Sequence, residues 1–352
     1  MVSFPDPRAR HPYHMHDMIR AQPAFLRETR GILEATDAAR FLRKPRRLVL
    51  TGCGTSYHAA LFGARVLQRA LGHAAVVEAV HAYDLPREER DFRRTTVLGV
   101  SHSGATPTTN AALQRARRRG ARVLGLSGLS ASPLEKVADD VLVIGSAHDR
   151  SWANTMSYTT QLMAFAGLAV QMGGPAWRRV LRSWRAVPGT AERALGTEAS
   201  IRRLAKRVVS RERVTFLGGG LDEITCLEAA LKIRETCSMP AVGYHLEQFL
   251  HGPLEGLDRR DAVVALLAQE DGARGDAILH ACAATRAYVG KIGAGPAVDA
   301  RLPRLPEVLR PIVTVIPLQF LAYYAALARK TNPDVMRTDR KEYRPAVELL
   351  FT

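Results

Sequence analysis

Short apolar segments alternate with longer segments of helical periodicity along the chain. In the first half, the apolar segments predict strands at Leu48–Leu50, Ala74–Ala79, Val97–Val100, Val123–Ser127 and Val141–Ile144. The helical periodicity predicts helices at Met18–Leu42, His58–Leu71, Thr108–Arg119 and Ser157–Met172, followed by a charged helical connection at Pro175–Val208. Strands that alternate with helices indicate an α/β fold, in which helices cover both faces of a parallel sheet.

The second half of the chain repeats this order. The segment Val214–Gly220 is similar to Leu48–Gly54, and the following helix and strands are expected at Asp222–Thr236, Val263–Leu267 and Tyr288–Ile292. The sequence therefore predicts two similar doubly wound parallel-sheet domains in tandem. The expected units are an N-terminal arm and helix (1–43), a first domain (44–195), a second domain (196–330) and a C-terminal tail (331–352).

The composition is typical of a globular protein. The chain has 352 residues, of which 47% are hydrophobic and 24% charged. The apolar stretch Pro311–Ala328 contains Pro317 and Gln319, so we expect a buried helix there rather than a membrane span. Met1–Arg10 carries charges and no apolar core, so no signal peptide is expected. Four scattered cysteines without a CxxC pair fit a reduced cytoplasm.

The formal net charge of +16 raises the question of a nucleic-acid partner. Much of this charge is arginine on predicted outer helix faces, and only 6% of the residues are aromatic, with no basic segment interleaved with them for base stacking. We therefore expect neither nucleic acid nor a membrane as a partner, and a positive field that attracts an anionic substrate. Because His11, His14 and His16 have no cluster of carboxylates or cysteines to complete a site, no metal is expected.

Hydroxyl-rich turns follow two of the predicted strands. The run Ser101–Thr109 reads SHSGATPTT and directly precedes a predicted helix, and the earlier turn Thr51–Tyr57 reads TGCGTSY. Free N–H groups at a helix start, the positive end of the helix dipole and small hydroxyl donors together bind a phosphate without metal. The two turns predict a phosphorylated small molecule as the ligand. The equivalent turn of the second domain, Ala268–Gly272, carries acids instead of serines and is not expected to hold phosphate.

Three ionisable residues share one face of the helix predicted at Asp222–Thr236, which follows the three glycines Gly218–Gly220. Glu228, Lys232 and Glu235 are spaced by four and then three residues. Taken alone, this spacing favours a surface ion-pair ladder. Apolar neighbours and the position of the helix after a strand end, where parallel sheets bind ligands, favour a site instead. A carboxylate and an amine held there could move a proton on a sugar carbon.

His251 ends this segment, directly before Gly252 and Pro253. A lone histidine is more often structural than catalytic. This one is fixed in direction between a helix and a Gly-Pro turn, so it is a candidate for proton transfer.

These motifs resemble the sugar isomerase (SIS) domain family in its tandem form. The resemblance rests on Thr51–Tyr57, Ser101–Thr109, LEAALKIRE at Leu227–Glu235 and HGPLEGLD at His251–Asp258. Within this family the chain resembles the isomerase half of glucosamine-6-phosphate synthase and its free-standing relatives, which include glucosamine-6-phosphate deaminases. The resemblance covers nearly the whole chain. It implies flavodoxin-like domains, a hexose or aminohexose 6-phosphate substrate, and no metal or organic cofactor.

The resemblance also assigns roles to individual residues. It implies that Glu235 is the base that moves a proton between C1 and C2. It also implies that Glu228 and Lys232 are catalytic residues that support the site and the amine or carbonyl of the sugar. It implies that His251 of a neighbouring subunit assists ring opening, which requires a homodimer with shared active sites. Contacts to phosphate and sugar are implied for Cys53, Gly54, Thr55, Ser56, Ser101, His102, Ser103, Gly104, Thr106, Ala153, Asn154 and Thr155. His102 replaces the family's usual glutamine, and we expect its side chain to alter contacts with the sugar hydroxyls.

Two departures from the family pattern bear on the reaction. The chain begins Met1-Val2, without a cysteine nucleophile next to the start, so we expect no glutaminase domain and no direct use of glutamine. Lys341 falls near the position of the family's imine-forming lysine but in a different sequence context, so it is either catalytic or a surface lysine.

The sequence favours an enzyme that converts glucosamine 6-phosphate to fructose 6-phosphate and ammonia, or the reverse. Plain isomerisation of another sugar phosphate stays open, as does ammonia-dependent amination of fructose 6-phosphate with a separate glutaminase. A non-catalytic sugar-phosphate sensor is a further alternative, although the presence of both Glu235 and His251 favours turnover.

Overall fold

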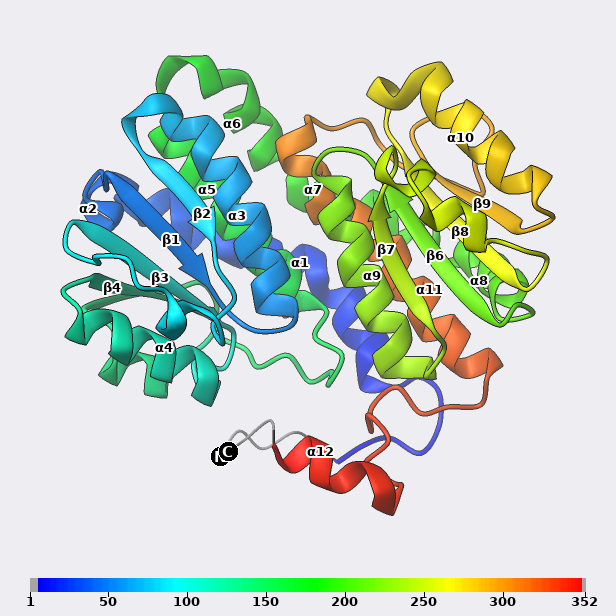
Figure 1. Cartoon of the computed structure of the whole chain (residues 1–352), viewed down its shortest axis with the longest axis horizontal. Helices are drawn as coiled ribbons and strands as arrows, with labels where there is room; N and C mark the ends of the chain where they lie inside the picture. Colours follow the sequence, from blue (N-terminus) through cyan, green and yellow to red (C-terminus); the bar gives the residue numbers. More distant parts are fainter. Residues whose placement is uncertain (1–5, 350–352) are drawn as a thin grey trace.

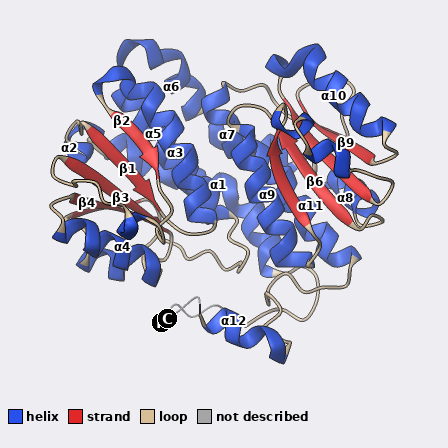
Figure 2. Cartoon of the chain, in the orientation of Figure 1, coloured by secondary structure: helices blue, strands red, loops and turns tan. Residues whose placement is uncertain are grey.

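The computed structural model describes residues 6–349, so the first residues of the predicted arm (1–5) and the last of the predicted tail (350–352) lie outside the described residues. Two five-stranded parallel sheets form the framework, one in each half (Figures 1 and 2). The first sheet contains β1 (Arg47–Thr51), β2 (Val76–Ala79), β3 (Thr95–Ser101), β4 (Arg122–Ser127) and β5 (Asp140–Val143). The second contains β6 (Arg213–Gly218), β7 (Ala241–His245), β8 (Asp261–Leu267), β9 (Tyr288–Gly293) and β10 (Ala300–Arg301).

The two sheets have the same topology. The first has the order β2-β1-β3-β4-β5, and the second, taken from its other edge, has the order β7-β6-β8-β9-β10. Neighbouring strands pair in parallel in both sheets. The apolar runs form strands because helices cover both faces of each sheet, and every residue of β3 is buried. The predicted tandem of α/β domains is confirmed.

Helices fill the space between the sheets and cover their outer faces. A continuous hydrophobic core runs through both halves, and two smaller clusters contain residues of α4 and α10. These two helices lie on the outer sides of the two sheets (Figure 2). The helices of the first half are α3 (Thr55–Leu71), α4 (Pro107–Arg118) and α5 (Met156–Met172). The connection and second half contain α6 (Arg178–Arg185), α7 (Val187–Leu195), α8 (Glu198–Val208), α9 (Asp222–Cys237), α10 (Gly272–Ala284) and α11 (Arg310–Ala328).

One segment, Glu307–Ala328, is long and apolar enough to cross a membrane, but 83% of its apolar window is buried inside the protein. It contains α11, which packs against α9, α8, α7, α5 and α1. This burial agrees with the predicted core helix.

The prediction of one N-terminal helix over Met18–Leu42 was wrong. The chain forms α1 (His14–Ala35) and, after a break, the short α2 (Ala38–Leu42). The break occurs because Asp37 caps the second helix: its carboxylate accepts a hydrogen bond from the N–H of Arg40 at 3.0 Å. The N-terminal helix folds against both halves, because α1 packs against α5, α7 and α11.

The turns after β1 and β3 lie side by side at the carboxyl edge of the first sheet. These strands are neighbours, with Thr51 paired to Gly99, and the chain leaves them toward opposite edges of the sheet. Such a switch in strand order leaves a crevice in which ligands of parallel sheets bind. Because α9 of the second half packs against α3, which begins in this crevice, both halves contribute to it.

Candidate active site

The hydroxyl-rich turn connects β3 to α4. Oγ of Ser101 and Oγ1 of Thr106 lie 3.0 Å apart, and the Ser103 hydroxyl accepts the N–H of Ala105 at 3.2 Å. Gly104 has φ +63°, and a Cβ there would lie 2.3 Å from Oγ of Ser132. The turn therefore requires glycine and presents small hydroxyls at a helix start, an arrangement that suits an anion.

The second predicted turn lies beside the first. Cys53 is half-buried, and its sulfur accepts the Thr109 hydroxyl at 3.8 Å, which links the turn after β1 to α4. Burial raises the pKa of the Cys53 thiol, so it is neutral at pH 7. The Ser56 hydroxyl accepts the side-chain N–H of Gln161 on α5 at 3.1 Å. The structure thus brings the two hydroxyl turns to one place.

The charged face of α9 points into the protein. The side chains of Glu228 and Lys232 are fully buried, and that of Glu235 is 16% exposed. Lys232 Nζ lies 3.2 Å from Oε1 of Glu228 and 2.7 Å from Oε2 of Glu235. The alternative of a surface ion-pair ladder is wrong, because α9 packs between α3 and α11.

Lys232 connects the two halves through hydrogen bonds. Its ammonium donates to the Thr55 hydroxyl at 3.0 Å and to the carbonyl of Ala153, both in the first half. The Thr55 hydroxyl donates in turn to Glu228 at 3.0 Å. The predicted residues of both halves therefore form one hydrogen-bonded cluster around a buried ammonium.

This cluster sets the charges of the three groups on α9. Burial opposes the ionisation of Glu228, but Lys232 and His58 outweigh it and hold the pKa of Glu228 below its usual value. Burial also opposes the charge on Lys232, yet the two carboxylates raise its pKa. For Glu235 burial prevails over the attraction of Lys232, so the pKa of Glu235 is raised. A carboxylate with a raised pKa and partial exposure suits proton transfer near neutral pH.

Sequence reasoning missed one residue of the cluster, His58, and one residue that holds the loop beside it, Asp149. Nδ1 of His58 lies 2.6 Å from Oε2 of Glu228. His58 stands three residues after Thr55 on α3, so helical spacing from the predicted turn was the available signal. The second is Asp149, whose buried carboxylate accepts backbone N–H groups of the loop that contains Ala153, Asn154 and Thr155. No spacing in the sequence indicates that role.

The position of the His102 side chain differs from the expectation that this side chain alters contacts with the sugar hydroxyls. The side chain is 8% exposed, and its ring Nε2 accepts the backbone N–H of Asp149 at 3.1 Å. Burial lowers the pKa of His102 to about 4, so the ring is neutral at pH 7. The expected change in sugar contacts through this side chain is not what the fold favours, because the ring points into the protein. The backbone of His102 remains in the turn.

His251 is not brought to Glu235 within one chain. Its side chain is 66% exposed, and its ring lies 3.9 Å from the Glu247 carboxylate. The N–H of Leu246, five residues before His251, donates to the carbonyl of Gly218 at the end of the second sheet where α9 begins. Glu235 lies near the other end of α9, about 20 Å along the helix axis from its first residue.

The C-terminal tail borders Glu235. Met336, Arg337 and Tyr343 line a cavity of about 420 Å³ together with Glu235 and residues that follow α9. The Arg337 guanidinium lies over the Tyr343 ring, 4.6 Å from its centre. Lys341 is exposed in the short helical turn between them. In Figure 1 this tail, which ends in α12 (Arg344–Glu348), passes beneath the lower end of α9.

The equivalent turns of the second half hold carboxylates of the chain itself. Asp271 accepts the N–H of Ala268 at 2.7 Å, and Glu307 accepts the N–H of Leu221 at 3.2 Å. The anionic groups thus lie where backbone N–H groups converge. This arrangement agrees with the expectation that the second turn does not hold phosphate.

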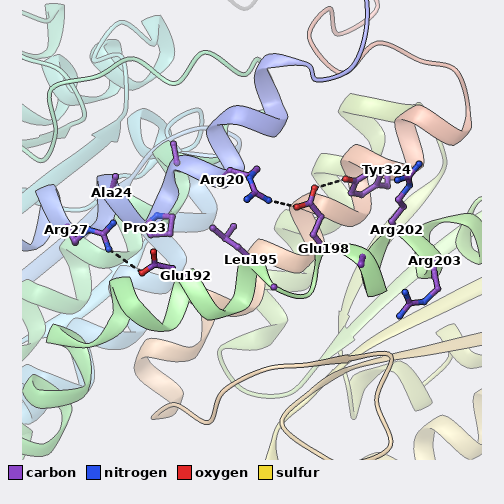
Figure 3. A pocket seen from close by; sticks show the side chains of 13 residues that line it. Arg20, Pro23, Ala24, Arg27, Glu192, Leu195, Glu198, Arg202, Arg203 and Tyr324 are labelled. Atoms are coloured by element: carbon purple, nitrogen blue, oxygen red, sulfur yellow. Dashed lines mark hydrogen bonds and ion pairs between the residues drawn. The ribbon is translucent and has the colours of Figure 1, made fainter.

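A larger cavity of about 980 Å³ lies between α1, α7, α8 and α11 (Figure 3). Two ion pairs lie along it: Arg20 lies 2.6 Å from Glu198, and Arg27 lies 3.7 Å from Glu192. Its lining comes from elements other than the two hydroxyl turns and α9, so it is separate from the candidate active site.

Comparisons with known proteins agree with this geometry. A family model described as SIS domain matches residues 41–171. The chain is 33% identical, over 94% of its length, to a glutamine–fructose-6-phosphate aminotransferase (isomerizing) from Symbiobacterium thermophilum, of which 58% is covered. The chain spans about half the length of the curated relatives it matches.

Solved structures share the fold. The C-terminal domain of glucosamine-fructose-6-phosphate aminotransferase from Francisella tularensis superposes with a TM-score of 0.84 at 20% identity, covering 92% of this chain and 98% of that one. A glucosamine-6-phosphate deaminase from Thermotoga maritima gives a TM-score of 0.76 at 20% identity, with 92% and 98% covered.

Proposed function

Because the chain belongs to the SIS-domain family, we propose that it is an enzyme that moves a proton between C1 and C2 of a hexose or aminohexose 6-phosphate. The reaction that we favour converts glucosamine 6-phosphate and water to fructose 6-phosphate and ammonia. One observation carries the proposal: the partly exposed Glu235 carboxylate is held by a buried lysine that also bonds to the hydroxyl turn at Thr55.

In this mechanism the turns of the first half bind the phosphate through Ser101, Ser103 and Thr106. Glu235 takes the proton from C2 of the open-chain sugar, exchanges it with solvent and then protonates C1. The electron pair of the broken C2–H bond forms the C1=C2 bond of an enolamine, and the aldehyde oxygen at C1 takes up a proton to become a hydroxyl. The C1=C2 pair then forms the new C1–H bond, while the nitrogen lone pair forms the C2=N bond and the nitrogen loses a proton, which leaves an imine at C2. Water adds to C2 and ammonia leaves, so C2 becomes the ketone of fructose 6-phosphate.

The remaining groups have supporting roles. Glu228 and Lys232 are fully buried, so they position Glu235 rather than contact the sugar. Ring opening is assigned to His251 of a second copy in a homodimer, because His251 is exposed and lies away from Glu235 of its own chain. Lys341 is a candidate for a direct sugar contact, since Arg337 and Tyr343 on either side of it line the cavity next to Glu235.

A second candidate is the amination of fructose 6-phosphate with ammonia from a separate glutaminase. The name of the relative from Symbiobacterium thermophilum favours it, since that protein is an aminotransferase that acts on fructose 6-phosphate. The two candidates use the same proton transfer in opposite directions.

The test is a proton NMR time course with glucosamine 6-phosphate in heavy water. We expect fructose 6-phosphate with deuterium at C1, and one ammonia for each sugar consumed. Glu235→Gln should slow turnover by 10²- to 10⁴-fold and retain substrate binding, whereas the exposed Glu192→Gln should match the wild type. Formation of glucosamine 6-phosphate from fructose 6-phosphate that is faster with a glutaminase and glutamine than with ammonium alone would favour amination, and full turnover by Glu235→Gln would reject Glu235 as the base.

A further inference from the structure

The ring of His102 is buried in the first half, between Gly128 at the end of β4 and Asp149 in the loop before α5. The carbonyl of His102 accepts the N–H of Gly128, directly after β4, at 2.9 Å. A Cβ at Gly128 would lie 2.0 Å from Nδ1 of the ring, so the ring occupies the space that a side chain would need. Ring Nε2 accepts the N–H of Asp149, and the proton of the neutral ring is therefore on Nδ1.

Asp149 orders the loop that precedes α5. Its buried carboxylate accepts the backbone N–H groups of Ser151 at 3.1 Å, Thr155 at 2.7 Å and Ser157 at 3.0 Å. It also accepts the Ser157 hydroxyl at 2.9 Å. One carboxylate thus holds residues 149–157 in a single conformation and caps the start of α5.

This loop reaches the candidate active site through Ala153. Its carbonyl accepts a hydrogen bond from Nζ of Lys232, which holds Glu235. Hydrogen bonds therefore connect the phosphate turn to Asp149 and Asp149 to Ser151 and Thr155, and the backbone between these two residues carries the Ala153 carbonyl that binds Lys232.

We propose that His102 is a positioning residue: its ring fixes the loop 149–157, and this loop fixes the ammonium of Lys232 beneath Glu235. The consequence for catalysis rests on the proposed function, since it takes Glu235 as the base. The ordering of the loop does not depend on any reaction. The residue that replaces glutamine in this turn thus acts on the sugar through Asp149 and Lys232, without a hydroxyl contact of its own.

Two substitutions distinguish the role of ring Nε2 from that of ring Nδ1. In His102→Gln the side-chain oxygen can reach the place of Nε2 and still accept the Asp149 N–H, whereas in His102→Asn it reaches only the place of Nδ1. The measurement is hydrogen–deuterium exchange of residues 149–157 in the full chain. We expect His102→Asn to raise exchange there at least tenfold and His102→Gln to stay within about twofold of wild type.

Binding and turnover of glucosamine 6-phosphate give the second measurement. His102→Asn should lower kcat at least tenfold while the Kd of the sugar phosphate stays within about threefold. Unchanged exchange in His102→Asn would overturn the proposal, as would a loss of affinity without increased exchange, which would place the side chain on the ligand. If His102→Asn does not fold, faster exchange in a folded His102→Gln overturns it equally. If the wild type turns over no sugar phosphate, the exchange result still decides the positioning role.

Discussion

The ammonium of Lys232 lies 2.7 Å from Oε2 of Glu235, and the lysine is fully buried while the carboxylate is partly exposed. One side of the carboxylate is therefore held by charge, and the other is open to a ligand. The lysine is also shared with Glu228, so its removal leaves two carboxylates in the interior without their cation.

Replacement of Lys232 by methionine should destabilise the fold by about 3–5 kcal/mol, because the buried Glu228 loses the charge that compensates it. Denaturation in urea at pH 7 measures this, with the exposed Lys206→Met on α8 as a control that should change stability by less than about 0.5 kcal/mol. Adding Glu228→Gln to Lys232→Met should recover part of the loss. A loss below about 1 kcal/mol for Lys232→Met would contradict a dry, charge-paired cluster.

The pH dependence of kcat should show an acid limb set by Glu235. Burial raises the pKa of Glu235 above its usual value, and the base must be ionised, so the rate should fall as the pH drops through a midpoint above 4.5. The charged groups that face this carboxylate are Lys232, Glu228 and His58. Rates measured from pH 8 down to pH 5 in folded protein test this. A rate that stays constant over the whole range would exclude a raised pKa for the base.

A shared active site can be tested by mixing two inactive variants. Glu235→Gln and His251→Asn each remove one group, and a mixed dimer would contain one site with both groups intact. After the subunits exchange, we expect about a quarter of wild-type activity, since half of the dimers are mixed and each has one working site of two. Glu235→Gln mixed with itself is the control. No recovery in proven mixed dimers would mean that both groups act within one chain.

The repeated α/β order was predictable because buried parallel strands leave a strong signal. Runs such as Val97–Val100 are apolar throughout, and the observed β3 extends the predicted strand only to Thr95 and Ser101. The first and last residues of the helices depended on capping instead. The helix expected from His58 begins at Thr55, since the turn itself supplies the first helical residues.

The candidate site was predictable as a set of residues but not as a geometry. Spacing placed Glu228, Lys232 and Glu235 on one face of α9, yet whether this face met solvent or α3 depended on packing between the halves. The partners of His102 and His58 come from segments distant in the sequence, so no local pattern specifies them. His251 requires a second chain in our proposal, which a single sequence does not place.

Gly128 should tolerate alanine only when the His102 ring is removed. The added Cβ would lie 2.0 Å from Nδ1 of this ring, and the ring is held on its other side by Asp149. We expect Gly128→Ala to cost about 1–3 kcal/mol in the wild type. In a His102→Ala background the same substitution should cost less than half as much. Denaturation of the four proteins forms a double-mutant cycle, and equal costs in both backgrounds would show that the ring does not occupy this space.

The buried ring should also make stability depend on pH. Burial lowers the pKa of His102 to about 4 in the folded protein, while in the unfolded chain it is near 6.5. Between these values the unfolded chain binds more protons, so the free energy of unfolding should fall as the pH drops from 6.5 toward 4. The expected contribution is on the order of 3 kcal/mol, and Asp149 and His148 are the titratable groups that face the ring. Urea denaturation of wild type and His102→Gln across this range isolates it, because the two proteins share every other ionisable group. The wild type should lose stability more steeply than the variant, and parallel curves would mean that the ring accepts a proton as readily in the folded chain as in the unfolded one.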